Sequence, residues 1–266
     1  MKFMDTANEA LMWQLSGFDA KYLKRQAERH NDYYGTDDTK QPEGIFQVDL
    51  EDVFVPLKLD FSMGGFQQRG RKTIEDCDDE SLEIWDVLKR LKKVGAYQSL
   101  AILADGGSGK TTMLRCVNYL YGTGGAKRFG VPKLLPFLLY LRQWRDEIAT
   151  NPGMTLAELM EKSVRDLRDW ENVKFPPQWA ENLLRNGRAL IMFDGFDEVA
   201  DDQRPIVGRW ISDCIEDYPK SLFILTSRPA GYDAYKEHAS ETLMTLMVRE
   251  FSKTERDTFA QKLYVA

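Results

Sequence analysis

A glycine-rich loop between an apolar run and a helix-forming stretch constrains the fold of this chain more than any other feature. The stretch LAILADGGSGKTTML covers residues 100–114, and its central part, ADGGSGKT at 104–111, follows the pattern G-x-x-x-x-G-K-[ST] except that Ala104 replaces the first glycine. That position ends a strand and opens a turn, so a methyl group is tolerated there. Gly107 and Gly109 keep the positions where the backbone must approach a phosphate closely. The pattern predicts a strand, a phosphate-binding loop and a helix in succession.

The residue types in this loop suit the phosphates of a nucleotide. Successive backbone N–H groups can turn inward around phosphate oxygens, and the following helix adds the positive end of its dipole. Lys110 is expected to reach the β- and γ-phosphates, and the Thr111 hydroxyl is expected to ligate Mg²⁺. The expected nucleotide-binding residues are Asp105, Gly106, Gly107, Ser108, Gly109, Lys110, Thr111 and Thr112.

A second motif, ALIMFDGFDEV at 189–199, places carboxylates at the end of another apolar run. Asp194 is expected to hold Mg²⁺ together with Thr111. Asp197 and Glu198 are expected to be catalytic, because a carboxylate beyond the strand end can orient or deprotonate an attacking water. An alternative for Asp197 is that it only caps a helix in a solvated acidic turn.

A third motif, LFILTSRPAGYD at 222–233, ends a further apolar run with polar side chains. Thr226, Ser227 and Arg228 are expected beside the γ-phosphate if this strand lies between the strands of the first two motifs. Arg228 is then expected to be catalytic, because a guanidinium there stabilises phosphate charge. The alternative is that Arg228 is an ordinary surface arginine.

The hydrophobic pattern predicts an α/β fold. Continuous rather than alternating apolar runs are typical of parallel strands that are covered on both faces. Helix signals separate the runs, including a capping box of Thr155 and Glu158 and a glycine stop at Gly122 for the helix after the loop. The predicted strands lie at 99–104, 134–141, 189–193, 222–226 and 243–248, and further helices are predicted near 176–187 and 203–217.

The first 95 residues are less regular and contain no catalytic constellation of their own. Alternating apolar residues predict a strand over 53–61, and an amphipathic pattern predicts a helix over 81–93. Stretches rich in Gly, Asp and other polar residues predict loops at 31–44 and 63–80.

Taken together, the motifs ILADGGSGKTTMLR, LIMFDGFDEV and FILTSRPAGY resemble the NACHT family of STAND-class P-loop ATPases, and specifically its prokaryotic type. The resemblance implies a P-loop NTPase fold whose five parallel strands have the order 5-1-4-3-2. It also implies that Asp194 is the Walker B acid, that Asp197 and Glu198 support hydrolysis, and that Arg228 is the sensor 1 arginine. Residues around 53–59 are implied to help cover the base.

The resemblance also implies a domain organisation. Residues 1–95 form an N-terminal flanking region, residues 96–250 the NACHT-type NTPase domain, and residues 251–266 the start of a small helical subdomain. In the family, a winged helix and C-terminal sensor and effector domains follow, so the sequence is expected to be a fragment.

The expected function is a nucleotide-controlled oligomerisation switch that binds ATP or ADP with Mg²⁺, hydrolyses ATP slowly and self-associates through its NTPase domain, in innate immune or antiphage defence. A non-hydrolysing ADP/ATP-binding scaffold and a small-molecule P-loop kinase are the alternatives. A net charge of −6 argues against tight non-specific nucleic-acid binding, and no apolar run is long enough for a membrane segment. Three separate cysteines without a CxxC pair favour a cytoplasmic location.

Overall fold

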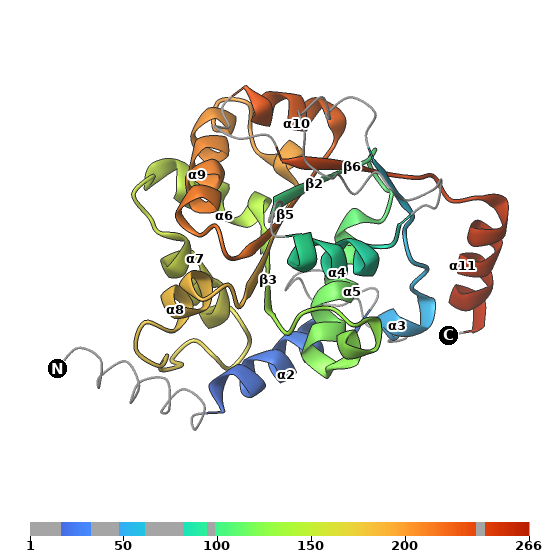
Figure 1. The fold of residues 1–266 in the computed structure, drawn as a ribbon, viewed down its shortest axis with the longest axis horizontal. Coiled ribbons are helices and arrows are strands. Elements are labelled where there is room, and N and C mark those ends of the chain that lie inside the picture. The colour runs from blue at the N-terminus through green and yellow to red at the C-terminus, as the bar shows by residue number, and fades with distance from the viewer. Residues whose placement is uncertain (1–16, 33–47, 62–81, 95–98, 238–242, 266) are drawn as a thin grey trace.

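The computed structural model describes residues 17–32, 48–61, 82–94, 99–237 and 243–265. The loop predicted at 63–80 and most of the loop predicted at 31–44 lie outside these residues. Within the described ranges the chain forms a mixed, mostly parallel sheet flanked by helices (Figure 1).

The sheet has six strands in the described part of the chain, in the order β1-β6-β2-β5-β4-β3. The five strands from β6 to β3 are parallel, and β1 pairs antiparallel with β6. If the five predicted apolar runs are numbered along the chain, the parallel part has the expected order 5-1-4-3-2, so the predicted fold class is confirmed. The strands are β1 (Leu59–Phe61), β2 (Ser99–Leu103), β3 (Leu135–Tyr140), β4 (Ala189–Asp194), β5 (Leu222–Ser227) and β6 (Met244–Val248).

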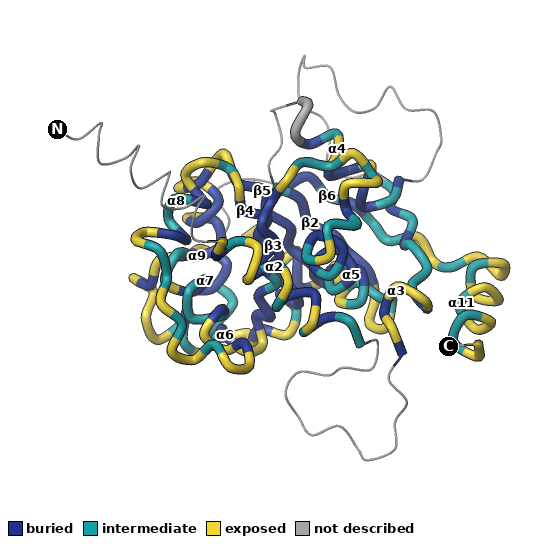
Figure 2. Tube along the Cα trace, turned by 90° about the horizontal axis from the view of Figure 1, so that it is seen from below, coloured by how far each residue is buried: buried dark blue, intermediate teal, exposed yellow. Residues whose placement is uncertain are grey.

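Helices cover both faces of the sheet because successive strand residues point to opposite sides. In β4, Leu190 and Met192 pack with α4 and α5, whereas Ile191 and Phe193 pack with α7, α8 and α9. The strands are accordingly the most buried part of the molecule, and α11 is exposed at one side (Figure 2). The described helices are α2 (Phe18–His30), α3 (Leu50–Val53), α4 (Ile84–Val94), α5 (Lys110–Thr123), α6 (Leu141–Thr150), α7 (Leu156–Arg165), α8 (Trp179–Arg185), α9 (Arg204–Asp217), α10 (Pro229–Lys236) and α11 (Lys253–Val265), with the short 3-10 helices η2 (Gly125–Phe129) and η3 (Phe196–Glu198).

Several local predictions are confirmed. Thr155 and Glu158 form the capping box: the Glu158 N–H donates to Thr155 Oγ1 over 3.2 Å, and the Thr155 N–H donates to the Glu158 carboxylate over 2.8 Å. The helix predicted over 81–93 is α4, and its apolar residues Ile84, Trp85 and Leu88 are buried.

Two local predictions are wrong. The helix after the loop does not stop at Gly122 but at Thr123, and Gly124 caps it with a φ of 78° that suits glycine. The strand predicted over 53–61 is limited to β1, because Val53 ends the short helix α3 and Pro56 has no N–H to donate to a strand ladder.

No described helix combines the length and the apolar character that a membrane crossing needs.

Candidate functional site

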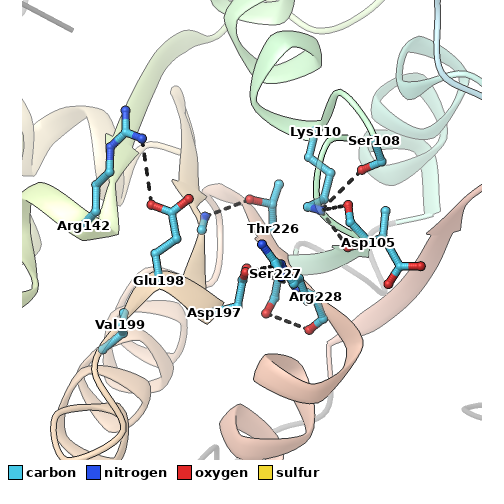
Figure 3. Close-up of polar contacts among 12 residues, drawn as sticks. Asp105, Ser108, Lys110, Arg142, Asp197, Glu198, Val199, Thr226, Ser227 and Arg228 are labelled. Carbon is cyan, nitrogen blue, oxygen red and sulfur yellow. Dashed lines mark hydrogen bonds and ion pairs between the residues drawn. The ribbon is translucent and has the colours of Figure 1, made fainter. Parts of the chain in front are cut away.

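The phosphate loop joins the end of β2 to the start of α5. Gly107 and Gly109 have φ values of 76° and 86°, which side chains other than glycine rarely adopt. The Lys110 ammonium group turns back over the loop and donates to the carbonyl oxygens of Ala104, over 2.7 Å, and Asp105, over 3.0 Å (Figure 3). The loop is therefore a curved backbone with a cation held in its concave side.

The environment of Lys110 affects its charge. Burial lowers the pKa of its ammonium group from the ordinary value, while the nearby carboxylates of Asp197 and Asp194 act in the opposite direction. A partly desolvated cation between backbone carbonyls gains from the arrival of an anion such as a phosphate.

Asp194 ends β4 at the base of the same loop and is 6% exposed. The Thr111 hydroxyl donates to its Oδ2 over 2.7 Å and the Thr226 hydroxyl donates to its Oδ1 over 2.5 Å. Burial raises the pKa of Asp194 above the ordinary value, and these two hydrogen bonds oppose the rise. The structure thus brings Thr111 and Asp194, the two expected metal ligands, into direct contact.

Thr111 and Asp194 fit a magnesium ion. Mg²⁺ prefers oxygen ligands and is commonly bound through one or two carboxylates together with substrate phosphates and waters. In the described residues no group of three or more His, Cys, Asp or Glu side chains offers a protein-only metal cage. A single carboxylate beside a hydroxyl is the donor set that a nucleotide-bound Mg²⁺ needs.

Asp197, within η3, and Arg228, directly after β5, form a pair. Asp197 Oδ1 accepts the backbone N–H of Arg228 over 3.0 Å, and Asp197 Oδ2 lies 3.0 Å from Arg228 Nε (Figure 3). The Arg228 guanidinium also lies against Gly106, where an added Cβ would be 2.9 Å from Nη2. Arg228 is 60% exposed in its side chain, yet it is directed at the phosphate loop and paired with a carboxylate.

Glu198 faces the same site from η3 but has different partners. Its carboxylate lies 3.9 Å from Arg142 Nη1 (Figure 3), and the Arg145 guanidinium donates to its backbone carbonyl. Burial raises the pKa of Glu198 from the ordinary value, and Arg142 opposes the rise. A carboxylate with a raised pKa at the rim of a site can accept a proton from water.

These groups line one cavity of about 930 Å³, a volume typical of sites for small molecules and cofactors. All eight predicted nucleotide-binding residues, 105–112, line it together with Asp194, Asp197, Glu198 and Arg228. The segment that the family resemblance implied to cover the base also reaches the cavity, through Phe54, Val55 and Leu57.

Some lining residues were not predicted from the sequence. Arg142, the second residue of α6, is not among them, but it contacts the lining residue Glu198 and was not predicted either; its place just after an apolar run was the available signal. The segment 247–251 and the α11 residues Arg256 and Phe259 also line the cavity. The pattern of α11 offers no comparable signal, because none of its residues is buried.

Comparison with known proteins gives one strong match. The family model of the NACHT domain matches residues 99–265, which is more than half of the 266 residues. No curated protein matches the chain.

Matches among solved structures are remote. They include a DNA replication initiation factor (11% identity, TM-score 0.38), the Aeropyrum pernix ORC1 protein in complex with DNA (14%, 0.39) and the Drosophila ORC bound to poly(dA/dT) DNA and Cdc6 (12%, 0.39). Each alignment covers 68% of this chain and, in the same order, 49%, 47% and 30% of the other. This chain therefore spans half or less of the length of these proteins, and scores at this level carry no argument about its activity.

Proposed function

Since this chain belongs to the NACHT-domain family of P-loop NTPases, we propose that it binds ATP and ADP with Mg²⁺, hydrolyses ATP slowly and uses the bound nucleotide to control self-association. One observation carries the proposal. A phosphate loop with its lysine, a Thr–Asp pair suited to Mg²⁺, and two further carboxylates with arginine partners converge on a single cavity.

The residues divide the work of binding. The loop backbone and Lys110 hold the phosphates, and Thr111 and Asp194 hold the metal ion, whose charge offsets that of the triphosphate. The apolar part of the cavity, around Phe54 and Phe259, is suited to a nucleobase.

Glu198 is the proposed general base. It orients a water molecule towards the γ-phosphorus and accepts its proton, while the bond from that phosphorus to the bridging oxygen of ADP breaks and inorganic phosphate leaves. Arg228 stabilises the charge on the transferred group. We expect slow turnover because the Glu198 carboxylate is also attracted to Arg142. This attraction favours the charged carboxylate and so opposes its uptake of a proton from water.

The biological role rests on family resemblance. We propose a prokaryotic cytoplasmic signalling module in innate immune or antiphage defence, and a fragment of a longer protein with sensor and effector domains. The domain limits at residues 95 and 250 and the self-association remain predictions.

Phosphate release from ATP and Mg²⁺ tests the proposal. We expect slow release by the wild-type chain and a fall of about 100-fold or more for Glu198→Gln, which keeps the shape of the side chain but cannot accept the proton. Asp202→Asn, in an exposed carboxylate nearby, is the matched control and is expected to behave as wild type. Equal rates in wild type and Glu198→Gln would remove Glu198 from the mechanism.

The alternatives have their own signatures in the same assay. Tightly held ADP without turnover above background would favour a nucleotide-binding scaffold. ADP formation that depends on an added acceptor would favour a small-molecule kinase.

A further inference from the structure

The two carboxylates that follow Asp194 have different surroundings. Asp197 is 17% exposed in its side chain, and each of its two oxygens contacts Arg228, one through the backbone N–H and one through Nε. Glu198 is 48% exposed, and its carboxylate lies 3.9 Å from its arginine partner. Both oxygens of the more buried carboxylate, Asp197, are therefore occupied by Arg228. The more exposed carboxylate, Glu198, is more accessible to a water molecule.

The backbone around Asp197 is held on both sides. Its carbonyl oxygen accepts a hydrogen bond of 3.1 Å from Arg204 Nη2 at the start of α9. On the other side, α10 approaches so closely that a Cβ added to Gly231 would lie 2.8 Å from Asp197 Cβ and 2.9 Å from its Cα. Asp197 is thus fixed between α9 and α10, and its carboxylate can serve as a rigid anchor.

Arg228 needs such an anchor. Its side chain is long and 60% exposed, and holding it in one position costs rotamer entropy. A fixed partner is needed to offset that cost. In the structure the guanidinium is instead held over Gly106, in the loop whose lysine faces the cavity. If Asp197 took a proton from water, it would lose the charge that holds this guanidinium.

From this arrangement we infer that Asp197 is a positioning residue that holds Arg228 over the phosphate loop, and so makes the site prefer a nucleoside triphosphate to a diphosphate. The inference rests on the proposed function, because it assigns a role within the same site. It divides the acidic pair, with Glu198 acting on water and Asp197 acting only through Arg228.

A double-mutant cycle tests this division. The variants are Asp197→Asn, Arg228→Ala and the double variant, and the measured quantities are the dissociation constants of a non-hydrolysable ATP analogue and of ADP, each with Mg²⁺, together with kcat and KM for ATP. Asparagine keeps an oxygen that can accept the Arg228 N–H but removes the charge that pairs with the guanidinium. Asp202→Asn is the control, and thermal unfolding confirms that each variant is folded.

We expect Asp197→Asn to reduce the preference for the ATP analogue over ADP by about tenfold, the equivalent of one charge-assisted contact. Arg228→Ala is expected to reduce it at least as much, and the double variant is expected to match Arg228→Ala alone. Asp197→Asn should then leave kcat unchanged in the Arg228→Ala background.

Two other results would overturn the inference. If Asp197→Asn lowers kcat by the same factor with and without Arg228, Asp197 acts on the reacting groups directly. If the effects of the two single variants on the affinity ratio multiply, the residues act independently. In both cases nucleotide binding by the wild type leaves the proposed function intact, whereas a wild-type chain that binds neither nucleotide overturns the proposed function and this inference with it.

Discussion

At the scale of single residues, the hydrogen bonds of Asp194 hold its carboxylate in position for a metal ion and stabilise its charge. A buried carboxylate pays for desolvation unless donors satisfy it, and here the hydroxyls of Thr111 and Thr226 donate to its two oxygens. The Thr226 hydroxyl also accepts the Gly195 N–H over 2.9 Å, so one side chain links the ends of β4 and β5. Thr226 therefore supports both the charge of Asp194 and the backbone turn that follows it.

Replacing Thr226 with valine tests this role. Thr226→Val removes a donor to Asp194 and leaves the buried Gly195 N–H without its partner, so the free energy of unfolding should fall by about 1–3 kcal/mol. It also removes one of the interactions that oppose the raised pKa of Asp194, so that pKa should rise further. Mg²⁺-dependent nucleotide binding should then weaken at a higher pH than in the wild type as the pH is lowered.

The matched control is Thr245→Val, in β6. Thr245 makes longer hydrogen bonds, of 3.3 Å to the Leu243 carbonyl and 3.4 Å to the Tyr232 hydroxyl, so a smaller loss of stability and no change in the pH dependence are expected. Chemical denaturation and titration of labelled nucleotide across a pH series measure both effects. Identical behaviour of the two variants would contradict the role given to Thr226.

Residues of the site differ in how far the sequence could predict them. Loop residues such as Lys110, and Asp194 at a strand end, could be predicted because their spacing from neighbouring strands and helices is set by the chemistry of phosphate binding. Phe259 could not, because its place at the cavity depends on how α11 packs, and local pattern does not encode that packing. The partner of Arg228 was missed for the same reason.

At the scale of elements, the N-terminal helix α2 braces the phosphate-loop helix α5. A Cβ added to Gly122 of α5 would lie 2.6 Å from the Leu23 carbonyl oxygen and 2.9 Å from the Ala27 N atom of α2. Between the same helices, the Asn118 amide donates to Gln26 Oε1 over 2.8 Å. The two helices are therefore in close backbone contact, and Gly122 serves this contact and not helix termination.

Gly122→Ala tests the contact. In an isolated helix the change would add up to about 1 kcal/mol of stability, because alanine is the better helix former. Here the new methyl group meets backbone atoms that cannot move cheaply, so we expect a net loss of about 1–3 kcal/mol in the free energy of unfolding. Gly153→Ala is the control, because that position is exposed and its nearest contact would be 3.8 Å away, at Asn151 Oδ1. A stabilised Gly122→Ala variant, measured by denaturant unfolding, would contradict the close contact.

The elements themselves were largely predictable. Buried parallel strands are continuous apolar runs, and the helices between them have caps and amphipathic stripes, so both could be recognised from local sequence. The N-terminal flank was harder, because β1 is three residues long and depends on pairing with β6, which is distant in the sequence. The bracing by α2 was not predictable, since it depends on a tertiary contact at a glycine.

At the scale of the whole molecule, parallel strands bring the site together. The phosphate loop follows β2, Asp194 ends β4, Arg228 follows β5, and the segment 247–251 covers the end of β6 and the residues after it. Because the carboxyl ends of parallel strands lie at one edge of the sheet, four of the five parallel strands, β2, β4, β5 and β6, deliver groups to the same cavity. The site is a product of the strand order, and its parts are far apart in the sequence.

A buried histidine makes the stability of the whole molecule depend on pH. Burial, with Arg29 nearby, lowers the pKa of His30 to about 3, and the ring is hydrogen-bonded to the Gln26 carbonyl through Nδ1 over 3.0 Å. In the unfolded chain a histidine takes up a proton below about pH 6.5, so the unfolded state binds more protons than the folded state between that pH and the lower value. The free energy of unfolding should therefore fall by about 2 kcal/mol from this group as the pH drops from 7 to 5.

The variant His30→Gln measures the contribution of His30 to the pH dependence of the free energy of unfolding. The variant cannot titrate in this range, so although it is less stable at pH 7, its stability should decline by about 2 kcal/mol less than that of the wild type between pH 7 and pH 5. His238→Gln, at the other histidine of the chain, is the control. Parallel declines in the wild type and His30→Gln would show that His30 does not contribute.

The central claim is that this cavity binds a nucleoside triphosphate through the phosphate loop. The most direct test titrates labelled ATP with Mg²⁺ into the wild type, into Lys110→Ala and into a control variant. The control is Lys127→Ala, which replaces an exposed lysine of η2. The account predicts saturable binding for the wild type and Lys127→Ala. At a ligand concentration of 100 times the dissociation constant, the free energy of unfolding of both should rise by about 2.7 kcal/mol, measured by thermal unfolding. Lys110→Ala should lose both effects. Undiminished binding by a folded Lys110→Ala variant, or none by the wild type, would contradict it.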